Sequence, residues 1–170
     1  MVMLEAARQG LEEGAWRVLR TVEDPELPAL SLVDLGIIRR VMVNANGELE
    51  VDLSPTYAGC PATSVIRTSV VAALKAAGFE QVMLKEVLAP AWTSDWISAE
   101  GREKLERCGI APPERVLTSP RQLMAEGPVL RCPRCQSLNT RELSSFGSTP
   151  CKALYRCDSC LEPFEYFKCH

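Results

Sequence analysis

The sequence is poor in several features that would mark a class of protein. It holds one histidine, His170, and aromatic residues make up only 6% of the chain. No apolar run approaches the roughly 20 residues that a membrane helix needs, and residues 1–13 carry acids where a secretory signal would be basic and then apolar. A formal net charge of −3 gives no overall attraction for nucleic acid or an anionic membrane. These absences predict a cytoplasmic protein with reduced cysteines.

Three catalytic arrangements are missing as well. A nucleophilic cysteine usually needs a histidine base, and a lone C-terminal histidine disfavours a Cys-His hydrolase. The chain has no Glu-x-x-His pair of the kind that binds di-iron on helices. It also lacks the Gly-rich fingerprint of a dinucleotide site. We therefore expect no catalytic residues for hydrolysis or oxidation in this chain.

Cysteine, by contrast, is abundant and unevenly placed. Six of the eight cysteines lie in residues 129–170. Four prolines without a sustained period precede them in residues 110–128, which is typical of a surface linker. The sequence therefore predicts a domain over residues 1–110, a linker over 111–128 and a cysteine-rich minidomain over 129–170.

The first part shows a succession of helix and strand patterns. Apolar residues at helical spacing predict helices over 11–22, about 61–77 and about 98–108. Strands are expected over 37–43, 49–53 and 81–88, with the first two joined at an Asn-Gly turn. In the second strand Glu50 and Asp52 should face water. The order α-β-β-α-β predicts a small two-layer domain of the α/β (α+β) class.

Cys60 stands before Pro61 at the expected start of a helix, where proline is well tolerated. Free N–H groups and the positive end of a helix lower a thiol pKa, and Gly59 permits close approach to the sulfur. This predicts a thiolate that acts as a nucleophile or a soft-metal ligand. The other interpretation is a small buried residue that caps the helix. Because no histidine base is at hand, a metal or cluster ligand is the better functional interpretation.

Three acids, Asp24, Glu26 and Asp34, fall in the loops that should frame the two-stranded hairpin. Paired carboxylates bind metals or relay protons. Asp-Pro-Glu is also a common helix-ending turn with solvated acids, which the sequence alone favours.

Two CxxC pairs in the last part, Cys132/Cys135 and Cys157/Cys160, are separated by 21 residues. Two such knuckles supply the four thiolates of a tetrahedral Zn²⁺ site, and a segment this short needs a metal for stability. The pattern predicts a zinc ribbon. Three aromatic residues should pack beside the metal: Phe164, Tyr166 and Phe167.

Other chemistries are open to the cysteine-rich part. Four thiolates also bind iron, as an ion or in a cluster. A redox CxxC normally needs a βαβ setting, which is missing here, and scattered cations disfavour nucleic-acid binding. Cys151 and Cys169 are either spare packing thiols or a second ligand set completed by Cys60. Trp92 and Trp96 form either a partner-facing patch or part of the core.

Four motifs of the first part stand in a recognisable order and spacing: Asp24-Pro-Glu26, Val33-Asp-Leu-Gly-Ile-Ile38, Thr56 and Gly59-Cys-Pro61. They resemble the SufT/PaaD-like family of iron–sulfur assembly proteins. The resemblance implies that Cys60 is the functional cysteine, and that Asp24, Glu26, Asp34 and Thr56 line a groove around it. It also implies a transiently held iron–sulfur cluster or iron ion as cargo.

Further segments resemble the members of this family that act in bacterial phenylacetate degradation: Ala91–Ile97, Gly101–Leu105, Gly109–Pro113 and Phe146–His170. This resemblance implies a non-catalytic accessory component of a phenylacetyl-CoA epoxidase. Its expected partners are the oxygenase and the [2Fe–2S] reductase of that system. Neither a membrane nor nucleic acid is expected, and homo-oligomerisation stays open.

Overall fold

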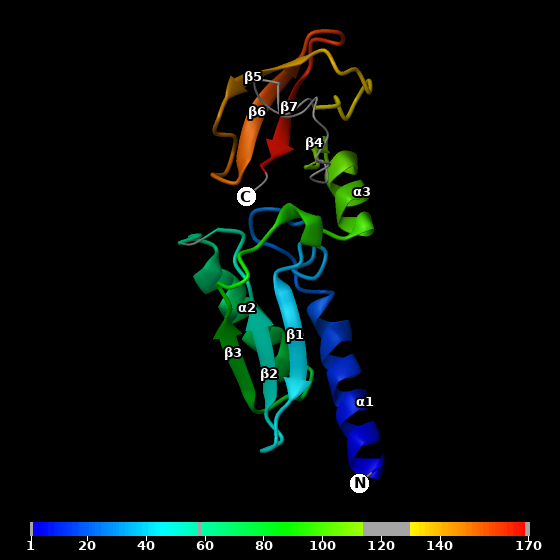
Figure 1. Cartoon of the computed structure of the whole chain (residues 1–170), viewed down its shortest axis with the longest axis vertical. Helices are drawn as coiled ribbons and strands as arrows, with labels where there is room; N and C mark the ends of the chain where they lie inside the picture. The colour runs from blue at the N-terminus through cyan, green and yellow to red at the C-terminus, as the bar shows by residue number, and fades with distance from the viewer. Residues whose placement is uncertain (1, 58, 114–129, 169–170) are drawn as a thin grey trace. The chain divides into compact units, whose positions relative to one another are not determined.

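The computed structural model describes residues 2–57, 59–113 and 130–168. The chain divides into two compact units, Met1–Gly101 and Arg102–His170, and each unit has its own β-sheet (Figure 1). The predicted α/β class is confirmed. Within the ranges given above, no helix combines the length and the apolar character needed to cross a membrane.

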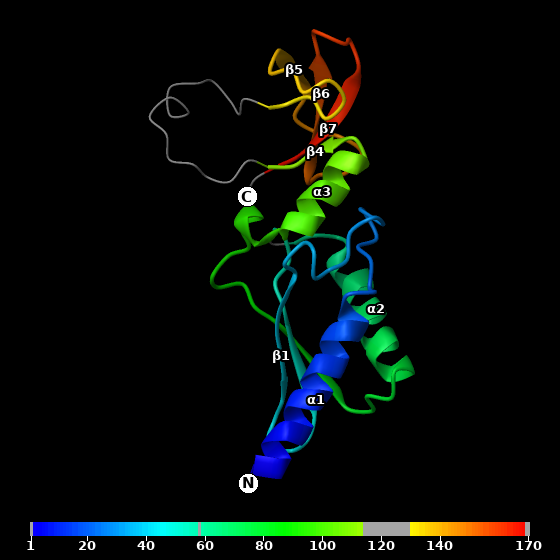
Figure 2. The ribbon, with the colours of Figure 1, turned by 90° about the vertical axis from the view of Figure 1, so that its right-hand side faces the viewer.

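The first unit is built on a three-stranded sheet in the order β1-β2-β3. Strands β1 and β2 are antiparallel, whereas β3 runs parallel to β2 because helix α2 crosses between them. Helices α1 and α2 lie side by side on one face of this sheet (Figure 2). The elements are α1 (Val2–Leu19), β1 (Ile38–Val43), β2 (Leu49–Leu53), α2 (Thr63–Ala76), β3 (Val82–Glu86) and the 3₁₀ turn η1 (Ser94–Trp96). Helix α3 (Ala99–Arg107) follows and contains the boundary between the units.

The helices bury the stripes that their periodicity predicts, with some exceptions. In α2 the inward residues Ile66, Val70 and Leu74 are buried as expected. In α1 the prediction was partly wrong, since Leu11 is exposed and the helix begins nine residues earlier. Residues 5–9 are mostly good helix formers and are exposed or half-buried, so the helix continues there without a buried stripe.

The second face of the sheet differs from the prediction. Glu50 and Asp52 do not face water but are buried in the centre of the sheet. The guanidinium group of Arg40 on β1 lies 2.9 Å from Glu50 and 2.7 Å from Asp52, and Lys85 on β3 lies 2.7 Å from Glu50. Alternation placed these acids on the correct face. It could not show that two long cationic side chains from the flanking strands cover them.

A close contact fixes the loop before β1. Gly36 has φ +67°, and a Cβ atom there would come within 2.6 Å of the Cβ and the carbonyl oxygen of Trp96. Trp96 in turn lies under Arg39, whose guanidinium carbon is 3.4 Å from the ring centroid. Trp92 is buried and donates its Nε1–H to the carbonyl oxygen of Leu35, at 2.9 Å. Both tryptophans therefore pack on the unit itself.

We expect Gly36→Ala to lower the free energy of unfolding by about 3 kcal/mol, because left-handed strain adds to an overlap that the backbone must relieve. Urea unfolding of the full chain, followed by tryptophan fluorescence, measures this change. Gly47→Ala is the matched control, since Gly47 has φ +81° with open space around it and should lose only the strain. Equal losses in the two variants would contradict the role of the Trp96 contact.

The second unit contains a four-stranded sheet in the order β4-β7-β6-β5. Its strands are β4 (Ile110–Ala111), β5 (Thr140–Ser144), β6 (Lys152–Cys157) and β7 (Pro163–Phe167). Strand β4 pairs in parallel with β7, so Ile110 and Ala111 lie in the ribbon sheet rather than at the junction expected from composition. Residues 114–128 of the predicted linker lie outside the described residues.

Candidate functional site

The two CxxC pairs meet at one point of the second unit. Cys132 and Cys135 precede β5, and Cys157 and Cys160 stand at the turn between β6 and β7. Their four sulfur atoms all lie within 4.8 Å of one another. The Sγ atoms of Cys132 and Cys160 are 3.8 Å apart, and those of Cys135 and Cys157 are 3.5 Å apart.

These distances fit a metal ion. Zn–S bonds of about 2.3 Å in a tetrahedron place neighbouring sulfurs about 3.8 Å apart, whereas a disulfide would require about 2.05 Å. Cys132 and Cys157 are fully buried, while Cys135 is exposed. The four residues are thus positioned to bind one metal ion, with two of the sulfurs on the inner side of this candidate metal centre.

The two knuckles are built alike, which explains why the sulfurs converge. In each, the first cysteine accepts a hydrogen bond from the N–H four residues later, Gln136 to Cys132 and Leu161 to Cys157, both at 2.9 Å. Gln136 and Leu161 both have positive φ, at 62° and 66°. This conformation suits glycine, so each knuckle holds some backbone strain while it turns its two sulfurs inward.

Without a cation, the thiols of this set differ in how easily they lose a proton. The backbone N–H of Cys160 lowers the pKa of the Cys157 thiol to about 6. The N–H of Ser137 lowers the pKa of Cys135, but its thiol neighbours, led by Cys157, outweigh this and raise it to about 12. Four thiolates this close repel one another, so full deprotonation requires a positive ion among them.

Two of the three predicted aromatic residues pack beside the cysteines. Phe164 and Tyr166 belong to one buried cluster with Cys132 and Cys157. Phe167 is buried too, but it lies outside this cluster and pairs with Lys152 at the other end of β6. Sequence reasoning missed Tyr155, whose ring lies 5.9 Å from that of Phe164 and 5.8 Å from that of Tyr166. Its alternation along β6 with Ala153 and Cys157 is the signal that could have found it.

For two further cysteines of this part, Cys151 and Cys169, the sequence left two interpretations open: packing thiols or a second ligand set. Cys151 is buried, and its Sγ lies 3.0 Å from the Thr149 Oγ1 rather than in the four-sulfur set. Cys169 lies outside the described residues. Cys151 thus stands apart from the four sulfur atoms that lie together.

Cys60 occupies a turn before α2. Helix α2 begins at Thr63 with Ala62 as its N-cap, so Cys60 and Pro61 precede the helix instead of opening it. The carbonyl oxygen of Cys60 accepts the N–H of Thr63 at 3.1 Å, and its own N–H donates to Tyr57 at 3.3 Å. Cys60 is half-buried, and Gly59 beside it is exposed at φ +84° with open space around it. The sulfur is thus held on a fixed turn near the surface.

The acids near this part of the chain are engaged locally. Asp24 is buried and accepts the N–H groups of Glu26 and Leu27, both at 2.9 Å. Asp24 thus forms the turn that the sequence favoured, but the expectation that this acid is solvated was wrong, because the turn buries its carboxylate. Glu26 and Thr56 are half-buried. Within the described part of the chain, only the ribbon cysteines form a set of three or more potential ligands, so these acids and Cys60 are not gathered into one.

Asp34 holds the loop before β1 in place. Its Oδ2 accepts the N–H and the Oγ–H of Ser31, at 3.0 and 2.8 Å, and its Oδ1 accepts the Oγ–H of Ser98 at 3.3 Å.

We expect Asp34→Ala to lower the free energy of unfolding by about 3 kcal/mol, because buried donors lose a charged acceptor. Urea unfolding measures it, with Asp34→Asn as the milder variant. Unchanged stability would show that the loop does not depend on this carboxylate.

Comparison with known proteins gives separate family matches for the two parts of the chain. Residues 12–90 match the family described as iron-sulfur cluster assembly protein. Residues 118–168 match the PaaD zinc beta ribbon domain. The chain is 45% identical over 154 residues, 91% of its length and 90% of the relative's, to a protein of Escherichia coli (strain K12) that is named as a subunit of a "Putative 1,2-phenylacetyl-CoA epoxidase". The chain belongs to the PaaD family.

Two other similarities concern the first unit of this PaaD-family protein. It is 36% identical over 95 residues, 55% of this chain and 90% of the relative, to an Fe-S protein maturation auxiliary factor of Porphyromonas gingivalis (strain ATCC BAA-308 / W83). A crystal structure of a DUF59 domain from Bacillus anthracis superposes with a TM-score of 0.55 at 23% identity, covering 59% of this chain and 96% of that one. The latter establishes the fold of the first unit.

Proposed function

We propose that this protein is a maturation component of a phenylacetyl-CoA epoxidase system, which hands iron or an iron–sulfur cluster to the oxygenase or the reductase. One observation carries the proposal: a single chain joins an iron–sulfur assembly match to the ribbon of the PaaD family. Its relatives bear the names of an epoxidase subunit and of a maturation factor. In this role the chain itself catalyses no oxidation, and it works in the cytoplasm, where thiols stay reduced.

Cys60 is the residue we assign to the cargo. A carrier must release what it binds, so its site should be accessible and should leave some positions of the metal to other ligands. Cys60 offers one soft sulfur on a turn with an exposed glycine beside it. Glu26 and Thr56, which are half-buried, are assigned to the surrounding groove. The buried Asp24 and Asp34 support it through the loops that they hold.

The resident metal of the ribbon is assigned as Zn²⁺. Zinc has no redox chemistry and favours four tetrahedral thiolates. These properties suit the ribbon, whose metal is expected to stabilise the fold and not to react. Cys132, Cys135, Cys157 and Cys160 would hold it. A four-thiolate iron site is the alternative, and elemental analysis of the protein distinguishes the two.

Omitting the chain tests the proposal. The oxygenase and reductase components are produced together with this protein or without it, and then purified. We expect the preparation made without it to contain less iron and acid-labile sulfide in at least one component, with a matching loss of epoxidation. Full loading in both preparations would refute a maturation role.

A second candidate is a permanent structural subunit that performs no cluster chemistry. The name of the 45% identical relative, which calls it a subunit, favours this candidate. It predicts that the chain co-purifies with the oxygenase in a fixed ratio and that component loading does not depend on it. A maturation factor would instead be found in substoichiometric amounts.

A further inference from the structure

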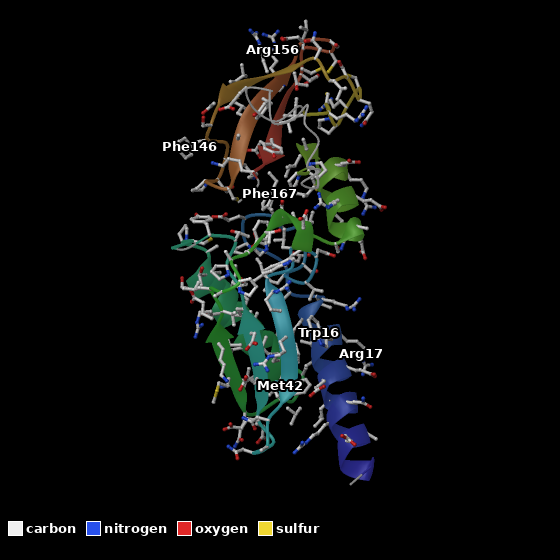
Figure 3. The ribbon with its side chains drawn as sticks, in the orientation of Figure 1. Trp16, Arg17, Met42, Phe146, Arg156 and Phe167 are labelled. Carbon is white, nitrogen blue, oxygen red and sulfur yellow. The ribbon has the colours of Figure 1, made fainter. Side chains whose placement is uncertain are left out.

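The loop between β5 and β6 carries an aromatic side chain that adds nothing to the core of its unit. Phe146 is 67% exposed, and Figure 3 shows its ring projecting away from the ribbon. Three residues earlier, Leu143 is the extra residue of a β-bulge in the edge strand β5, and it is half exposed. Bulges redirect side chains at sheet edges. Two large apolar side chains, three residues apart in the sequence, are thus exposed in the edge strand β5 and in the loop that follows it.

This loop is held firmly on the side of β5. The carboxylate of Glu142 accepts the Oγ–H of Ser145 at 2.6 Å and the phenolic O–H of Tyr155 at 3.1 Å. Burial and this carboxylate raise the pKa of Tyr155 to about 12, so the phenol remains a donor at neutral pH. The backbone N–H of Phe146 itself donates to the Ser144 Oγ at 3.2 Å.

The other side of the loop rests on a buried ion pair. Lys152, only 4% exposed, places its Nζ 3.0 Å from Glu165 on β7. The second oxygen of Glu165 accepts the N–H of Ser148 at 2.6 Å. A Cβ atom at Gly147 would come within 2.7 Å of that carboxylate. Burying a lysine is costly, and here it fixes the turn that presents Phe146.

One cation accompanies the exposed ring. The Nζ of Lys168 lies 4.8 Å from the centroid of Phe146 and donates to the carbonyl oxygen of Ser145 at 3.1 Å. Across residues 130–168, ion pairs join other charges, but none joins a carboxylate to Lys168. Glu165 is paired with Lys152, whereas Glu142 is exposed and accepts hydrogen bonds from Ser145 and Tyr155. Lys168 is thus the cation that lies next to the ring.

We propose that Leu143, Phe146 and Lys168 form the surface by which the ribbon docks on a partner protein. The partner offers an apolar pocket for the phenyl ring and a carboxylate at the rim of that pocket for Lys168. A rigid convex aromatic side chain loses little entropy on binding and is suited to act as an anchor. That the partner is a component of the epoxidase rests on the function proposed above.

Binding of the full-length protein to purified oxygenase and to purified reductase tests the proposal by biolayer interferometry. We expect Phe146→Ala to raise the Kd for one of them by about tenfold or more. Lys168→Glu should also raise the Kd, and the Kd of this variant should no longer increase with salt concentration. Leu138→Ala, which alters a half-exposed leucine of the same unit, is the matched control and should change the Kd less than about twofold. Each variant must keep the wild-type metal content.

Three results would overturn the proposal. They are a Kd of Phe146→Ala within twofold of the wild type, no binding of the wild type to either component, and sedimentation showing that Phe146→Ala converts a dimer into a monomer. The last would assign the surface to a second copy of this chain. Phe146→Ala could weaken binding while the iron and sulfide content of the oxygenase and the reductase does not depend on this chain. That pair of results would support the docking surface and refute the maturation role. If instead the content depends on the chain but Phe146→Ala binds like the wild type, the maturation role is supported and the docking surface is refuted.

Discussion

Replacing Cys132 by serine is expected to unfold the ribbon sheet and to abolish binding of one metal ion per chain. Cys132 is completely buried, and its Sγ lies 3.8 Å from that of Cys160. A structural Zn²⁺ supplies on the order of 10–16 kcal/mol of apparent binding energy to small metal-dependent folds. The eight-residue cluster of the second unit is too small to replace it.

Elemental analysis gives the metal content, and near-UV circular dichroism reports the order of Tyr155 and Tyr166 in the cluster. Cys108→Ser is the matched control, because Cys108 is exposed and stands apart from the four-sulfur set. It should keep both signals. A full complement of metal in Cys132→Ser, or an ordered ribbon after the metal has been removed by a chelator, would show that the sheet does not depend on the ion.

The second large effect is expected from Cys60→Ser. It concerns the client, which is the epoxidase component that receives the iron or the cluster, and not the fold of this chain. Serine keeps the size of the side chain and the hydrogen bonds of the turn are made by the backbone, so stability and ribbon metal should not change. The hydroxyl is a poor ligand for iron compared with a thiolate. We expect the iron and sulfide recovered in the purified client to fall by about tenfold, in line with the loss of a metal ligand.

Client loading is measured after co-production with the wild type, with Cys60→Ser and with Cys108→Ser. The last variant again removes one thiol from the first 110 residues, at an exposed position. Loading that survives in Cys60→Ser would leave Cys60 with a packing role and favour the permanent subunit. Loading lost in both variants would indicate a general effect of thiol removal.

Much of the first unit could be predicted from the sequence because its elements are locally encoded. Strand β2 has the predicted bounds, and the buried residues of α2 follow its 3.6-residue period. The errors arise where contacts with residues far away in the sequence determine burial or strand pairing. Glu50 and Asp52 are buried by Arg40 and Lys85, and β4 exists because β7 accepts it as a parallel neighbour. A two-residue strand leaves no pattern of its own.

The same distinction between local and distant contacts explains which parts of the candidate sites could be predicted. Each CxxC knuckle is a local turn, so spacing alone predicted the residues whose sulfurs the structure brings within 4.8 Å. The start of α2 was placed two residues too early, since proline at the first helical position is only a preference, and Cys60 thereby lost its expected place at the helix end. The carboxylates could not be sorted from sequence, because Asp34 is engaged by Ser98, 64 residues away.

The position of β4 changes what counts as a separable piece of this protein. Ala111 and Leu130 are buried in the same cluster, so residues on both sides of 114–129 contribute to one hydrophobic core. A protease that cuts within residues 114–129 would therefore nick the second unit without freeing it, and the two fragments should stay associated under native conditions. A fragment that starts at residue 129 would carry all four metal ligands but expose the edge of β7. Such a truncated ribbon would be prone to aggregate through that edge, whereas one that begins at residue 102 would not.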